Sequence, residues 1–144
     1  MPTAYNSQQR TAGFLKAAED AGLTIVAQQS AQWDQTTAVI VTSGMLVQHP
    51  QLAAIIAAND NMALGALAAI SQSGKSGQLA IVGFDNISAV RDLVKSGTIL
   101  ATADQHADLL AVYGIEYALQ GLSSGAVLKD RATPVDLITS ENTE

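Results

Sequence analysis

The sequence predicts a single α/β domain, a doubly wound parallel sheet with helices on both faces. Short runs that are apolar throughout, rather than alternating with polar residues, indicate strands buried on both faces. These runs alternate with longer helical segments, which is the pattern of βαβ units. Hydrophobic residues make up 48% of the 144 residues and aromatic residues only 4%. The core must therefore consist mainly of Ala, Val, Ile and Leu, a composition that suits close packing of helices on a sheet.

The first third of the chain predicts two helices with a strand between them. Residues 7–21 form the first helix, because Gly22 supplies the glycine that commonly ends a helix in the left-handed conformation. The apolar run 23–27 predicts a short buried strand. Asp34 is a suitable N-cap for a second helix, which extends to His49 because a proline follows it.

The middle of the chain repeats this alternation. The apolar run 52–58 predicts a strand, and the segment 61–73, rich in Ala, Leu and Met, predicts a helix. Asp60 is expected to cap that helix, and Gly74 is expected to end it. Residues 78–84 predict the next strand.

The last third predicts two more helices and two more strands. Residues 88–96 form a helix that ends at Gly97, and residues 98–103 form a strand. A long helix is expected over residues 107–122. A loop of Ser and Gly and then a proline lead to a final strand over residues 135–139.

The composition and charge exclude several classes of function. Seven basic and thirteen acidic residues give a net charge of −6, and no basic cluster could neutralise a phosphate backbone, so we expect no nucleic-acid partner. Cysteine is absent, which excludes disulfides, thiolate metal sites and cysteine nucleophiles. His49 and His106 lack the spacing of metal ligands, so surface or capping roles are expected for both. No serine lies in a nucleophile-elbow motif, and we expect no catalytic residues, no metal and no cofactor.

Polar residues gather where the predicted strands end, and open α/β sheets bind ligands at this edge. The turns concerned lie at residues 30–34, 59–61, 85–87 and 104–106. Asp and Asn side chains exchange hydrogen bonds with hydroxyl groups, and the single tryptophan, Trp33, offers a face for the C–H side of a sugar ring. The pattern is typical of a site for a neutral, polyhydroxylated ligand.

The same side chains also have structural interpretations, and the residues alone leave these open. Asn59, Asp60 and Asp85 each follow a strand and precede a helix, where Asp and Asn are favoured as caps. Trp33 could pack in or near the core. Arg10, near the beginning of a helix, could be a solvated charge.

Several motifs together resemble the ribose-binding group of type I periplasmic binding proteins. The two main segments are AANDNMALGA at residues 57–66 and IVGFDN at residues 81–86. Upstream, RTAGF at residues 10–14 is similar to the start of that family's arginine-bearing helix. Downstream, LATADQ at residues 100–105 is similar to its strand into the hinge. The resemblance covers nearly the whole chain and implies one Rossmann-like lobe of the type I fold.

The resemblance implies a role for five residues in binding a sugar, a pentose or a hexose. Arg10 and Asn59 would donate hydrogen bonds to sugar oxygens. Asp85 would accept from one or two hydroxyls, and Gln105, near a hinge crossing, would add a polar contact. Trp33 would place its ring against the sugar.

The function implied by the resemblance is that of the solute-binding component of an ABC-type sugar importer. Such a protein lies in the periplasm, closes two lobes around its ligand and delivers it to a membrane permease. The alternative is the effector-binding core of a lactose-repressor-like transcription regulator, which shares the fold and the main motifs. A regulator needs a helix-turn-helix, and none is present in this sequence.

Residues 1–144 are expected to form a single truncated sugar-binding lobe, because family members carry an N-terminal lobe and one more strand before the arginine helix. That strand is an interior one, so its absence is expected to leave an exposed sheet edge and to cause homo-oligomerisation. The helix and loop over residues 106–128 would pack on the missing lobe. With half of the contacts absent, sugar binding by this chain is expected to be millimolar or weaker.

Overall fold

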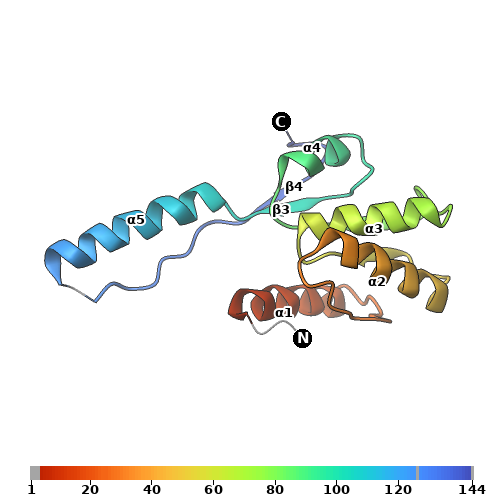
Figure 1. Ribbon diagram of the computed structural model, residues 1–144, viewed down its shortest axis with the longest axis horizontal. Coiled ribbons are helices and arrows are strands. Elements are labelled where there is room, and N and C mark those ends of the chain that lie inside the picture. Colours follow the sequence, from red (N-terminus) through yellow and green to blue (C-terminus); the bar gives the residue numbers. More distant parts are fainter. Residues whose placement is uncertain (1–3, 126, 144) are drawn as a thin grey trace.

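The computed structural model describes residues 4–125 and 127–143 (Figure 1). The helices are α1 (Tyr5–Asp20), α2 (Gln35–Gln48), α3 (Asp60–Gln72), α4 (Ser88–Lys95) and α5 (Ala107–Ser124). The strands are β1 (Ala54–Ile56), β2 (Ala80–Val82), β3 (Thr102–Asp104) and β4 (Asp136–Ile138). No helix in the described ranges is long and apolar enough to cross a membrane.

All five predicted helices are present, with ends close to those expected. Asp34 caps α2 as predicted, because its Oδ1 accepts a hydrogen bond of 2.7 Å from the amide of Thr37. Gly22 and Gly74 adopt φ angles of +69° and +72° just after α1 and α3, a conformation that glycine adopts without steric cost.

The residue that caps α3 differs from the prediction. Asn59, not Asp60, is the N-cap, and its Oδ1 accepts a hydrogen bond of 2.9 Å from the amide of Met62. Asp60 is the first residue of the helix, and its carboxylate binds the amide of Ile87 and the hydroxyl of Thr102 instead. Asn and Asp are equally good caps, so propensity could not distinguish two adjacent positions.

The strands form two pairs, β1–β2 and β3–β4, which adjoin to make a sheet that is parallel except at β4. β1 and β2 are parallel, with Ile55 opposite Ile81. β2 continues toward β3 through a parallel bridge between Val82 and Ala101. β3 and β4 are antiparallel. The predicted class, an α/β fold with a parallel sheet, is confirmed, and the antiparallel β4 is a feature that the apolar pattern did not indicate.

The predicted strand over residues 23–27 is wrong, because no strand forms there. Its apolar side chains are exposed instead, with accessible fractions of 59% for Leu23, 47% for Ile25 and 52% for Val26. A strand needs a hydrogen-bonded neighbour, and within the described part of the chain no strand pairs with this segment. The apolar character of residues 23–27 indicates that they should be buried, whereas in this structure their side chains are exposed.

The edge of β1 that faces away from β2 is likewise unpaired. The carbonyl of Ala53 and the amide of Ala57 bind β2, at 3.0 and 2.8 Å. Since alternate residues of a strand direct their peptide groups to the same side, those of Ala54 and Ile56 point to the other side. No strand of the described residues lies there. The sheet therefore has an open edge at β1.

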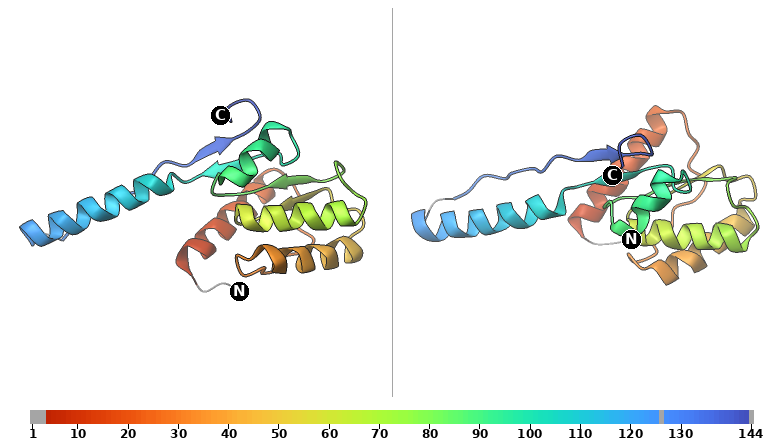
Figure 2. Two further views of the ribbon diagram at one scale, coloured as in Figure 1. Left: turned by 45° about the horizontal axis from the view of Figure 1, so that its top comes forward. Right: turned by 90° about the horizontal axis from the view of Figure 1, so that it is seen from above.

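Helices α2, α3 and α4 share one hydrophobic core on the sheet. Its largest fully buried apolar side chains are those of Ile70, Ile81, Val90, Val94 and Ile99. Helix α1 lies across the sheet from these helices (Figure 2), and there the rings of Phe14 and Phe84 meet edge to face with centroids 6.4 Å apart. Helices thus cover both faces of the sheet.

Helix α5 extends away from this body and contributes no buried residue (Figure 1). Its exposed apolar side chains include those of Leu110, Val112, Ile115, Leu119 and Leu122. The segment between α5 and β4 runs back beside the helix. There Nη1 of Arg131 lies 3.1 Å from Oε2 of Glu116, and Cζ of Arg131 lies 3.3 Å from the centroid of the Tyr113 ring.

Helices α2 and α3 touch closely at Gly65. A Cβ atom added there would collide with the carbonyl oxygen of Gln35 and lie 2.7 Å from the Cβ of Ala38. Gly44, which lies within α2, has open space around the corresponding position. Of these two glycines, Gly65 is therefore the one that has to be small.

We expect Gly65→Ala to lower the free energy of unfolding by about 1–3 kcal/mol, because the methyl group would push the two helices apart. Gly44→Ala is the matched control, and it should raise the stability by about 0.5–1 kcal/mol, because alanine is the better helix former. Urea unfolding followed by circular dichroism measures both. Equal effects of the two substitutions would contradict the packing described here.

Candidate functional site

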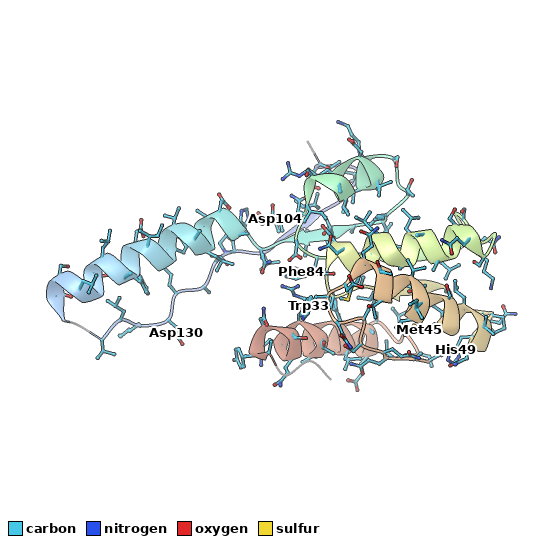
Figure 3. All side chains as sticks on the ribbon, in the orientation of Figure 1. Trp33, Met45, His49, Phe84, Asp104 and Asp130 are labelled. Carbon is cyan, nitrogen blue, oxygen red and sulfur yellow. The ribbon has the colours of Figure 1, made fainter. Side chains whose placement is uncertain are left out.

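The predicted site residues lie at the carboxyl ends of the strands. Asn59 follows β1, Asp85 follows β2 and Gln105 follows β3, while Arg10 comes from α1 and Trp33 from the turn before α2. Trp33, Phe84 and Asp104 lie in succession along this edge, whereas His49 lies at the far end of α2 (Figure 3). The fold thus brings residues 95 positions apart into direct contact.

Arg10 connects these elements. Its Nη1 donates a hydrogen bond of 2.6 Å to the carbonyl of Ala58, the residue before Asn59. Its Nη2 donates to Oε1 of Gln105 at 3.3 Å, and Nη1 lies 3.7 Å from Oδ1 of Asp85. Only 10% of the Arg10 side chain is accessible. The alternative of a solvated surface charge is therefore excluded.

Gln105 completes a closed polar cluster. Its Nε2 donates a hydrogen bond of 2.7 Å to Oδ1 of Asp85, while its Oε1 accepts from Arg10. The amide group therefore bridges a cation and an anion, with its donor and acceptor each on the matching partner. Asp85 is not a helix cap, because α4 begins after Ile87 and has no side-chain cap.

Two aromatic rings enclose the guanidinium group. Arg10 Cζ lies 3.7 Å from the centroid of the Phe84 ring and 5.4 Å from that of Trp33, both within cation–π range. Phe84 was not among the residues predicted for the site, although its position directly before Asp85 could have indicated it. Trp33 is partly buried and adopts a φ of +63°.

Some hydrogen-bonding capacity remains for a ligand. Asn59 is 7% exposed and uses Oδ1 as the cap of α3. Neither its Nδ2 nor Oδ2 of Asp85 takes part in any described bond, and both groups suit a hydroxyl partner. Asn59 can therefore both cap its helix and donate to a ligand.

Burial and charge act against each other in this cluster. Burial raises the pKa of the Asp85 carboxyl, and the nearby Arg10 lowers it. Burial lowers the pKa of Arg10, while Asp85 and Asp60 raise it, and a guanidinium remains charged in either case. The pair persists in a partly dry environment because each charge has polar neighbours.

A second polar cluster lies where the chain leaves the body toward α5. His106 Nε2 is 2.8 Å from Oδ2 of Asp136, and Asp104 accepts 2.8 and 2.9 Å bonds from the amide of His106 and Nδ2 of Asn86. His106 occupies the N-cap position of α5, but its side chain caps no helix amide and contacts Asp136 instead, so the predicted capping role is not what this side chain does. The described residues do not bring three metal-ligating side chains together.

Comparison with known proteins gives consistent matches. A family described as a periplasmic binding protein domain matches residues 1–125. A D-ribose/D-allose-binding protein of Pseudomonas aeruginosa is 45% identical over 142 residues, which cover 96% of this chain and 44% of that protein. A D-allose-binding periplasmic protein of Escherichia coli is 34% identical, over 90% of this chain and 41% of its own length. The chain therefore spans less than half the length of these curated relatives.

Solved structures show the same relationship. An ABC transporter periplasmic solute-binding protein from Actinobacillus succinogenes with bound D-allose has a TM-score of 0.92 at 34% identity, covering 99% of this chain and 51% of that one. A solute-binding protein from Burkholderia multivorans has a TM-score of 0.89 at 43% identity, covering 94% and 48%.

The contact between His106 and Asp136 predicts a pH dependence. The hydrogen bond to Asp136 raises the pKa of His106 above its ordinary value. The contact therefore stabilises the fold fully below the ordinary histidine pKa of about 6.5, and this stabilisation is lost as the pH rises through the raised pKa. An NMR titration should give His106 a pKa above about 6.5, and Asp136→Asn should move it toward that value. Glu116→Gln is the control, because it removes a carboxylate that does not contact His106, and it should leave the pKa of His106 unchanged. If Asp136→Asn also left this pKa unchanged, Asp136 could not be the group that raises it.

Proposed function

Because the chain belongs to the periplasmic binding protein family, we propose that it is one lobe of a two-lobed sugar-binding protein. The complete protein would be the solute-binding component of an ABC-type sugar importer in the periplasm. The observation that carries the proposal is the polar cluster of Arg10, Asp85 and Gln105 at the carboxyl ends of the strands. The relatives reported above are sugar-binding proteins by name, which favours an importer over a transcription regulator.

The proposed role is binding rather than catalysis, and each of the five predicted residues makes a different contact with the sugar. Arg10 and the Nδ2 of Asn59 donate to sugar oxygens, and Oδ2 of Asp85 accepts from hydroxyls. Gln105 orients Arg10 and Asp85 and adds a contact of its own. Trp33 presents the ring face that Arg10 does not cover to the C–H side of the sugar.

The other half of the site would come from an N-terminal lobe. The exposed apolar side chains of α5 support this proposal, since five or more such groups on one helix are unusual on a free surface. Residues 106–128, apart from residue 126, which lies outside the described residues, would pack on that lobe. Closure of the two lobes would bury the sugar before it reaches the membrane permease.

For this chain alone, the open edge of β1 supports a second proposal. The unpaired peptide groups of Ala54 and Ile56 offer an edge for a strand of a second copy, and the exposed apolar segment 23–27 offers apolar groups that such a copy would cover. A homo-oligomer of this kind would bury apolar groups that the single chain leaves in water.

Half of a sugar site should bind weakly. We expect titration calorimetry of this chain with D-ribose and D-allose to give dissociation constants in the millimolar range or weaker. This corresponds to a binding free energy no more favourable than about −4 kcal/mol. Micromolar binding by the chain alone would contradict the half-site.

Fusion to the N-terminal part of the Pseudomonas aeruginosa relative should restore tight binding of one of these sugars. Asp85→Asn should weaken it by at least tenfold or so, whereas Asp92→Asn, on the exposed side of α4, should leave it unchanged.

Self-association is expected for this chain at concentrations of tens of micromolar. Light scattering after size-exclusion chromatography should give a dimer mass or a higher one. Ile56→Lys should reduce the mass to that of a monomer, because a lysine on an edge strand opposes pairing with another chain. Val47→Lys makes the same change at an exposed position of α2, away from the edge, and should not. A wild-type chain that remains strictly monomeric would refute this proposal.

A further inference from the structure

The turn between β2 and α4 has a backbone that ordinary residues avoid. Asp85 has a φ of +114° and Asn86 a φ of +54°. Two consecutive residues of this kind, neither of them glycine, persist only where their surroundings hold them in place. Asp85 carries the carboxylate that faces Arg10 and Gln105. The direction of this carboxylate therefore depends on whatever fixes the turn.

The amide of Asp85 donates to the carbonyl of Ala103 at 2.8 Å, and Asp60 and Thr102 hold the peptide groups on either side of it. The amide of Asp60 donates to the carbonyl of Phe84 at 2.8 Å. The amide of Ile87 donates to Oδ2 of Asp60 at 2.9 Å. The amide of Asn86 donates to Oγ1 of Thr102 at 3.3 Å, and that hydroxyl donates to Oδ1 of Asp60 at 2.8 Å. We refer to Asp60 and Thr102 together as the brace.

The brace lies beneath the site and not in it. Asp60 and Thr102 are each 0% exposed, so neither can touch a ligand that enters from the solvent. The sequence leaves room for the carboxylate at Gly83, where a Cβ atom would collide with Oδ1 of Asp60 and lie 3.4 Å from the Cβ of Ala63. Asp60 is not the cap of α3 either. Its two oxygens are used on the turn and on β3.

We infer that Asp60, acting through Thr102 and the amide of Ile87, is the positioning residue for the Asp85 carboxylate in the sugar site. This inference rests on the proposed function. When the brace is removed, Asp85 and Asn86 relax toward ordinary backbone angles, and the carboxylate turns away from Arg10 and Gln105. Sugar affinity is then lost through a residue that the sugar never contacts.

The first test uses the two-lobed fusion to the Pseudomonas aeruginosa N-terminal part and calorimetry with the sugar that it binds. Thr102→Val removes the hydroxyl from the brace and keeps the shape, and it should weaken binding about tenfold or more. Thr102→Ser restores the hydroxyl and should retain most of the affinity. Thr42→Val makes the same change at another buried threonine, in α2, and should leave affinity unchanged. Asp60→Ala should have the largest effect, where it folds.

The second test uses the sugar-free chain and needs no ligand. The side-chain amide of Gln105 donates to Asp85, so its NMR signals report where that carboxylate lies. Thr102→Val should shift these signals, and Thr42→Val should not. Unchanged signals together with wild-type sugar affinity in Thr102→Val would overturn the inference. A wild-type fusion that binds neither sugar, while Thr102→Val still shifts the Gln105 signals, would instead overturn the proposed function.

Discussion

The carboxylate of Asp60 is buried without solvent contact, and burial of an isolated charge is costly by several kcal/mol. Burial raises the pKa of this group, and hydrogen bonds from Thr102 and from the amide of Ile87 oppose that rise. The same bonds hold Asp85 and Asn86 in backbone conformations that cost about 1–3 kcal/mol each. One interior group thus connects α3, β3 and the turn after β2, and the residues of the proposed sugar site lie above it.

One side of the lobe is closely packed, whereas the other side has an unpaired strand edge and exposed apolar side chains. The core shared by α2, α3 and α4 is closely packed, to the point that α2 and α3 meet at a glycine, Gly65. On the other side, residues 23–27 and the edge of β1 lack a strand partner among the described residues, and α5 extends into solvent. The proposed site adjoins both sides, because Arg10 comes from α1 and binds the carbonyl of Ala58, which follows β1. The hydrogen bonds among Arg10, Gln105 and Asp85 are nevertheless made entirely by side chains of this lobe.

Features that depend on local sequence could be predicted, and features that depend on partners could not. Helical segments, their glycine ends and the cap at Asp34 follow from propensity, and all are present. The strand over residues 23–27 was predicted from apolar residues, but a strand also needs a neighbour. Gln105 lies in a turn that the strand pattern already indicated, but Arg10 was linked to the site only through the family resemblance, since nothing local places it beside a residue 95 positions away. Local sequence predicts a cap at Asp60, because its actual partners, Thr102 and Ile87, are distant in sequence.

We propose that this lobe alone holds its half of the sugar site in a binding arrangement. A crystal structure of the 144-residue chain without sugar tests it most directly. In that crystal structure, Arg10 should donate to the carbonyl of Ala58 and Gln105 should lie between Arg10 and Asp85. An Arg10 side chain extended into solvent, with Gln105 separated from Asp85, would contradict it.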